Sequence, residues 1–98
     1  MSYQLTVRKE AEQDIAEYFD YYEEIRAGLG HDFILCIEEA LSKIERTPLN
    51  YRVIHNNVRR IAIRRFPHRV FYILRESNVV VIAVFHAQKD PSSWNKRL

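Results

Sequence analysis

Arginine and histidine side chains in the third quarter of the chain are the residues whose chemistry stands out. Six arginines and no lysine lie between positions 59 and 75. The apolar run from Val79 to Phe85 then ends at His86, which Lys89 follows closely. Arginine offers a planar fork of N–H donors that matches phosphate and carboxylate groups, and histidine titrates near neutral pH. This pattern predicts a site for an anionic ligand.

The candidate residues for binding an anion or a partner are Arg59, Arg60, Arg64, Arg65, Arg69 and Lys89. Because Arg65 and Arg69 flank Pro67, we expect a turn that brings both to one rim. The charge of the whole chain supports an anionic partner. Residues 1–49 carry five Lys/Arg against eleven Asp/Glu, a net charge of −6, whereas residues 50–98 carry ten against two, a net charge of +8. Such asymmetry favours nucleic acid or an acidic protein segment as the partner of the basic half.

The composition sets the broad class. A chain of 98 residues with 47% hydrophobic and 29% charged residues predicts one globular domain spanning 1–98. The single Cys36 has no internal disulfide partner, and no apolar run reaches the ~18 residues of a membrane-spanning helix. We therefore expect a cytoplasmic protein that contacts no membrane. No glycine-rich phosphate loop and no Cys/His metal spacing occurs, so we expect no metal and no cofactor.

The first half of the chain is typical of a strand followed by two helices. Residues 3–8 alternate as a short edge strand. From Lys9 the apolar residues recur at helical spacing until Gly28 and Gly30, which we expect to break the helix. A second apolar stripe starts near Gly30 or His31 and ends at Pro48. The result is a helical hairpin.

The second half is typical of antiparallel strands. We expect residues 51–55, the turn Asn56-Asn57 and residues 58–66 to form a hairpin, and residues 68–75 and 79–86 to form two further strands. Asp90 and Pro91 predict the start of a short helical tail. The fold class is therefore α+β, a two-layer β-α-α-β-β-β domain with the helical hairpin packed on a mainly antiparallel, twisted sheet. We expect the other sheet face to be uncovered, partly concave and lined by arginines.

Several segments together resemble a known family. They are Asp-Ile-x-x-Tyr-x-x-Tyr-Tyr-Glu (14–23), the Gly-Leu-Gly break (28–30), Arg-Arg-Phe-Pro-His-Arg-Val-Phe-Tyr (64–72) and Ala-Val-Phe-His-Ala-Gln-Lys-Asp-Pro-x-x-Trp (83–94). This combination, which spans nearly the whole chain, resembles the RelE/ParE superfamily of type II toxins. The resemblance implies a bacterial toxin that an acidic, partly disordered antitoxin neutralises, in a complex that binds operator DNA through the antitoxin.

The superfamily divides by mechanism. RelE-like members cleave mRNA on the ribosome, and in this chain the resemblance gives Arg65, Arg69 and His86 as the catalytic candidates. No lysine lies between Lys43 and Lys89, and no tyrosine accompanies His86, which departs from the RelE pattern. The motif Phe-Pro-x-x-Val-x-Tyr resembles that of ParE-like members, which poison DNA gyrase. The sequence therefore favours a gyrase poison, with a ribosome-dependent endoribonuclease and a non-toxic binding module as alternatives.

Overall fold

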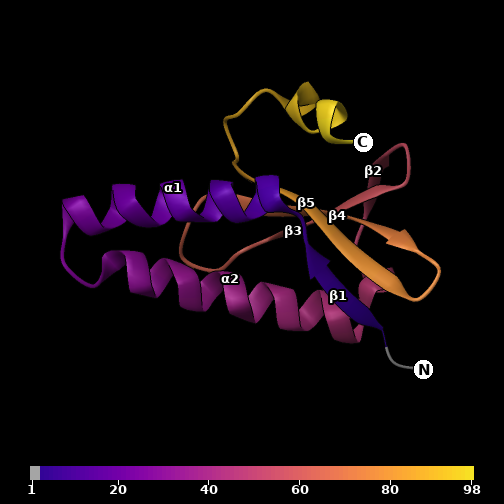
Figure 1. Cartoon of the computed structure of the whole chain (residues 1–98), viewed down its shortest axis with the longest axis horizontal. Helices are drawn as coiled ribbons and strands as arrows, with labels where there is room; N and C mark the ends of the chain where they lie inside the picture. Colours follow the sequence, from indigo (N-terminus) through magenta and orange to yellow (C-terminus); the bar gives the residue numbers. More distant parts are fainter. Residues whose placement is uncertain (1–2) are drawn as a thin grey trace.

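The computed structural model describes residues 3–98, apart from the side chain of Pro91 (Figure 1). Its elements follow the predicted order of strand, two helices, strands and a helical tail. They are β1 (Gln4–Val7), α1 (Lys9–Ile25), α2 (Leu29–Arg46), the 3₁₀ turn η1 (Pro48–Asn50), β2 (Val53–His55), β3 (Val58–Ala62), β4 (His68–Arg75), β5 (Asn78–His86) and the 3₁₀ tail η2 (Pro91–Arg97). The predicted α+β class is confirmed.

The five strands form one mixed sheet in the order β1-β5-β4-β3-β2. β1 pairs with β5 in parallel, with Leu5 opposite Val79, and the other neighbours are antiparallel. β1 is at an edge, as its short alternating sequence predicts. β5 has a neighbour on each side and a hydrophobic core on each face, and burial of both faces is why its sequence is apolar at almost every position.

The hairpin between β2 and β3 turns at Asn56 and Asn57, whose φ angles are 48° and 66°. Two successive positive φ values make the tight turn that the paired asparagines predict. The predicted length of the third strand is wrong, because β3 ends at Ala62 and residues 63–67 form a loop. Pro67 has no N–H to donate to a ladder, and Arg65 has a φ of 71°, so the chain leaves the sheet here.

Gly28 separates the two helices, with a φ of 91° that glycine adopts without strain. Gly30 does not break a helix, which corrects the prediction, since it lies in the first turn of α2. A Cβ atom on Gly30 would come within 2.7 Å of the carbonyl oxygen of Phe19, so glycine is needed for close packing of the helices. The N–H groups of Gly28 and Gly30 donate to the carboxylate of Glu23 (3.2 and 2.8 Å), which lowers the pKa of Glu23.

Both faces of the sheet carry a hydrophobic core. The helix-side core joins Ala11 and residues of α2, including Phe33 and Ile37, to alternating residues of β3, β4 and β5. On the opposite face, which we call the open face, Phe71, Ile82 and Phe85 pack against Trp94 of η2. Trp94 is only 5% exposed. The expectation of an uncovered face is therefore only partly right, because the tail covers some of it.

β5 contains a β-bulge near its middle. Phe71 pairs with Ala83 and Tyr72 pairs with Val81, so Ile82 has no opposite residue in β4. On the other side β1 has already ended, and the Arg8 N–H donates to the Val81 carbonyl as the last bond of that ladder (2.9 Å). The backbone of β5 beyond Val81 therefore needs partners that no strand supplies on its β1 side.

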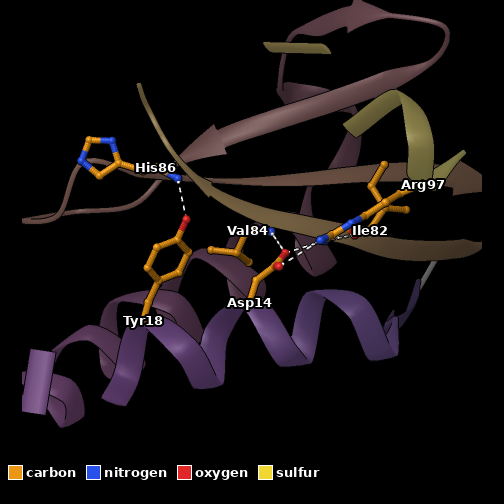
Figure 2. Close-up of polar contacts among 6 residues, drawn as sticks. All are labelled: Asp14, Tyr18, Ile82, Val84, His86 and Arg97. Atoms are coloured by element: carbon orange, nitrogen blue, oxygen red, sulfur yellow. Dashed lines mark hydrogen bonds and ion pairs between the residues drawn. The ribbon is translucent and has the colours of Figure 1, made fainter. Parts of the chain in front are cut away.

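Side chains of α1 and η2 supply those partners (Figure 2). Asp14 Oδ2 accepts from the Val84 N–H (3.0 Å) and the Tyr18 hydroxyl accepts from the His86 N–H (3.2 Å). The spacings match, because four residues of helix rise about 6.0 Å and two residues of strand about 6.6 Å. Arg97 Nη1 donates to the Ile82 carbonyl (3.1 Å), and Arg97 Nη2 donates to Asp14 Oδ1 (3.0 Å). One helix face thus covers the free edge of β5.

No helix in residues 3–98 is both long and apolar enough to cross a membrane.

Candidate functional site

A basic pocket of about 190 Å³ lies on the open face between the sheet and the tail η2. Two arginines on neighbouring strands form its charged side. Arg60 is opposite Phe71, and Arg69 is opposite Ala62, so both point to the same face as diagonal neighbours. The pocket is lined by Ile54, Arg60, Arg69, Phe71, Phe85, His86, Ala87, Lys89, Asp90 and Trp94. We call this the basic pocket.

Aromatic rings form the floor of the basic pocket. Phe85 is opposite Arg69 in the β4–β5 ladder, and its ring stacks obliquely on Phe71 with centroids 5.8 Å apart. The ammonium of Lys89 lies 4.8 Å from the Phe85 centroid, a cation–π distance. Trp94 closes the pocket from η2. A ligand here meets apolar surface below and positive charge around it.

Positive charge exceeds negative charge in the basic pocket. Among residues 3–98 no ion pair involves Arg60, Arg69 or Lys89. Burial lowers the pKa of Arg60, and the charges of Arg69 and Arg52 lower it further. Asp90 also lines the pocket, where its carboxylate caps η2 by accepting from the Ser92 N–H (2.9 Å). Its negative charge offsets one of the three positive charges. The pocket therefore attracts an anionic group.

His86 stands at the end of β5 on the wall of the basic pocket. Its Nδ1 accepts from the Gln88 N–H (3.0 Å), which fixes the ring against the following turn. His86 and Arg69 are the two predicted catalytic candidates that line the basic pocket, although the ladder pairs Arg69 with Phe85 on the open face and His86 with His68 on the helix side.

The remaining predicted arginines lie elsewhere. Arg64 Nε is 3.1 Å from Glu39 Oε1, and Arg65 Nη2 is 3.6 Å from Asp32 Oδ2, so both meet α2 on the helix side. The loop therefore places Arg65 and Arg69 on separate sides rather than at one rim.

Arg59 is also on the helix side. Its guanidinium donates to the carbonyls of Tyr51 (2.6 Å) and Leu49 (3.4 Å), where it ties the segment before β2 to β3. Alternation along β3 predicts that Arg59 and Arg60 face opposite ways, but it does not say which face the helices cover.

Some pocket residues have no signal in the sequence as functional groups. Phe71 and Phe85 look like ordinary core residues, and Ile54 belongs to a short edge strand. Trp94 packs the tail on the body of the protein and also forms a pocket wall. Its position three residues after Pro91, in the predicted helical tail, is the one sequence feature that pointed to Trp94. No group of three metal-ligating side chains occurs in the part of the chain that the structure describes.

The comparison with protein families decides the identity. Residues 5–91 match the family described as "ParE toxin of type II toxin-antitoxin system, parDE". The chain belongs to this ParE toxin family. The match includes every residue of the basic pocket except Trp94. Among curated proteins, no sequence matches this chain closely enough to count as a relative.

Solved structures share the fold. A chain of the chromosomal ParDE toxin–antitoxin system of P. aeruginosa matches with a TM-score of 0.78 at 12% identity, over 87% of this chain and 96% of that one. A chain of the RelBE2 toxin–antitoxin complex of Mycobacterium tuberculosis matches with a TM-score of 0.65 at 17% identity, over 88% and 99%. A mutant of the E. coli toxin RelE in its free state gives 0.62 at 16% identity, over 99% and 94%.

Chains from a ParDE system and from a RelBE2 complex, and a RelE toxin, therefore share the architecture seen in this ParE-family chain. At these identities the likeness concerns the fold alone, and a shared fold does not fix the target of a toxin. The chain is a type II toxin of the RelE/ParE superfamily, and its mechanism has to be argued from its surface.

Proposed function

We propose that this ParE-family toxin stops growth by binding and poisoning DNA gyrase, and that an acidic segment of its antitoxin neutralises it at the basic pocket. The observation that carries the second part is the excess positive charge of Arg60, Arg69 and Lys89, none of which forms an ion pair in residues 3–98, above an aromatic floor. An amphipathic acidic segment matches both features. The resulting complex binds operator DNA through the antitoxin, as in a plasmid-stabilisation module.

The choice of gyrase rests on the family and on what the pocket lacks. The matching family is that of ParE toxins, whose ParE-like members the sequence resembles. RNA cleavage by the 2′-hydroxyl needs a proton acceptor, a proton donor and cations around one phosphate. Of the three candidates for those roles, Arg65 is paired with Asp32 of α2 and does not line the basic pocket with Arg69 and His86. A protein that acts by binding needs no such trio.

Pulse-labelling of DNA and protein synthesis in the first minutes after induction of this chain alone tests the target. We expect DNA synthesis to fall first while translation continues. Purified protein should then inhibit supercoiling by gyrase and cause DNA breaks. Gyrase that is untouched at a large excess of the protein contradicts the proposal.

Charge reversal tests the antitoxin site. Arg60→Glu combined with Arg69→Glu should weaken antitoxin binding by at least about 100-fold, since two favourable ion pairs become repulsive. Arg75→Glu is the matched control, because Arg75 ends β4 in an exposed position outside the pocket. Binding should also weaken as salt is raised. Equal affinity of the double variant and the control refutes this docking site.

A ribosome-dependent endoribonuclease is the second candidate. The observation in its favour is that His86, Arg60, Arg69 and Lys89 all line one pocket, where cations can stabilise a phosphate and an imidazole can move a proton. On this reading His86→Ala abolishes toxicity while the fold and antitoxin binding persist, and protein synthesis falls first. Normal growth on overexpression without antitoxin favours instead a non-toxic binding module.

A further inference from the structure

A second hollow lies on the helix side of the sheet, across His86 from the basic pocket. It has a volume of about 340 Å³. One wall comes from α1 and the other from the ends of β4 and β5, and its lining residues are Glu17, Tyr18, Tyr21, Tyr22, His68 and His86. We call it the tyrosine hollow. His86 is the residue that the two cavities share.

Tyrosine rings dominate the tyrosine hollow. Tyr21 is 59% exposed although its side chain is largely apolar, and its ring centroid is 5.2 Å from that of Tyr22. Tyr18 and Tyr22 also pack on the buried imidazole of His68, at 4.3 and 5.8 Å. The faces of such rings carry partial negative charge and attract cations.

Full negative charge lies beside these rings. Glu17 is exposed at the rim, and among residues 3–98 it forms no ion pair. The pKa of the Tyr18 hydroxyl is raised, first by burial and also by the charges of Asp14 and Glu17. The basic pocket and the tyrosine hollow therefore favour ligands of opposite charge, although His86 lines both.

The imidazole of His68 is the unexplained group of the hollow. It is 1% exposed, and neither ring nitrogen has a hydrogen-bond partner in the described part of the chain. Buried polar side chains are hydrogen-bonded in the large majority of cases. Burial keeps this ring neutral, so one of its nitrogens is an acceptor. Both nitrogens are enclosed by the protein, so a donor entering the hollow satisfies the acceptor when the ring of Tyr18 or Tyr22, which pack on the imidazole, shifts.

We propose that the tyrosine hollow binds an arginine side chain of a partner protein. A guanidinium stacks on tyrosine rings, pairs with the carboxylate of Glu17 and offers spare N–H donors to the acceptor nitrogen of His68. An acidic side chain is repelled by Glu17. An apolar side chain leaves Glu17 and His68 without partners. The partner is thus one that presents arginine on the helix side, irrespective of what binds the basic pocket.

Titration of the purified chain with N-acetyl-arginine amide, followed by NMR of the tyrosine and histidine rings, tests this directly. We expect saturable shifts of Tyr18, Tyr21, Tyr22 and His86 with a Kd of about 1–10 mM, as fits one small ligand side chain. N-acetyl-citrulline amide is the matched control, because it has the same shape without the charge. It should bind at least about 10-fold more weakly.

Variants locate the site. Glu17→Gln and Tyr21→Ala, both at exposed positions, should each weaken binding of the arginine probe by about 3-fold or more. Glu12→Gln, on the same helix but outside the hollow, should leave it unchanged, and so should the Arg60→Glu, Arg69→Glu double variant. The absence of saturation at about 100 mM probe, equal binding of citrulline, or full affinity in both Glu17→Gln and Tyr21→Ala overturns the proposal. The antitoxin and gyrase assays are unaffected by any of these results.

Discussion

The ion pair between Asp14 and Arg97 holds the C-terminal tail against α1 and the free edge of β5 (Figure 2). Asp14 also accepts the Val84 N–H, and Arg97 also donates to the Ile82 carbonyl. Asp14→Asn is the sharpest perturbation of this arrangement. The asparagine oxygen can still accept from Val84, but the charge that Arg97 needs is lost and the amide N–H₂ has the wrong polarity.

The magnitude follows from burial. The side chains of Arg97 and Asp14 are 22% and 13% exposed, so the pair is much nearer to the buried than to the exposed limit. Removing one partner of a buried pair costs about 3–5 kcal/mol, whereas an exposed pair contributes about 0–1 kcal/mol. We expect Asp14→Asn to lower the free energy of unfolding by about 2–3 kcal/mol. Asp14→Ala should cost about 1 kcal/mol more, since the Val84 N–H then loses its acceptor.

Urea unfolding followed by circular dichroism measures this loss, and thermal unfolding should show Tm falling by about 10–20 °C. Glu39→Gln is the matched control. It breaks an ion pair of similar length, Glu39 to Arg64 at 3.1 Å, whose side chains are 38% and 66% exposed. The control should cost less than about 1 kcal/mol. A double-mutant cycle with Arg97→Met should give a coupling energy of at least about 1 kcal/mol.

The reasoning is refuted if Asp14→Asn unfolds within about 0.5 kcal/mol of the parent chain. It is equally refuted if the cycle shows no coupling, because the loss would then come from Asp14 alone rather than from its pairing with Arg97.

Three further predictions concern single buried groups. Gly30→Ala should lower the unfolding free energy by about 2–3 kcal/mol in urea titrations, because its Cβ would meet the Phe19 carbonyl at 2.7 Å; an unchanged midpoint contradicts this packing role. Tyr72→Phe should cost about 1–2 kcal/mol in the same assay, since the buried Pro48 carbonyl loses the hydroxyl that donates to it at 2.6 Å. Burial, with a contribution from His86, lowers the pKa of His68 from 6.5 to about 4, so between these values the unfolded chain binds a proton that the folded chain does not. The folded state is therefore not penalised by His68 above the unfolded pKa, and the free energy of unfolding falls as pH drops through this window. His68→Phe should reduce the loss of unfolding free energy between about pH 7 and about pH 4.5 by about 2–3 kcal/mol; identical pH profiles of the two proteins would count against it.

Periodicity was enough to predict the elements and the fold class. The helical stripes of α1 and α2, the asparagine turn and the apolar run of β5 are local patterns, and local geometry decides them. The end of β3 was mispredicted because residues 63–66 continue the alternation of the strand. The alternation of apolar and polar residues does not predict the positive φ of Arg65, which together with Pro67 takes the chain off the sheet.

The sequence predicted the chemistry of the candidate site but only some of the residues that form it. Charge asymmetry and the arginine-rich strands predicted an anion-binding surface, and Arg60, Arg69, His86 and Lys89 do line one pocket. Arg59, Arg64 and Arg65 carry the same chemistry but face α2 or the segment before β2. Which side of a strand faces the helices depends on contacts between segments far apart in the sequence.

The sequence by itself determined the family, the order of elements and the sign of the charge on each half of the chain, because these depend on residue type and short-range spacing. Only the tertiary structure decided which backbone groups Asp14 and Tyr18 bind. They stand 70 and 68 residues before the N–H groups they bind in β5, and the early end of β1 and the bulge at Ile82 create that need. It likewise decided that His86 lines both a cationic pocket and an anionic one, since both are assembled from surfaces that meet only when the helices and the tail pack on the sheet.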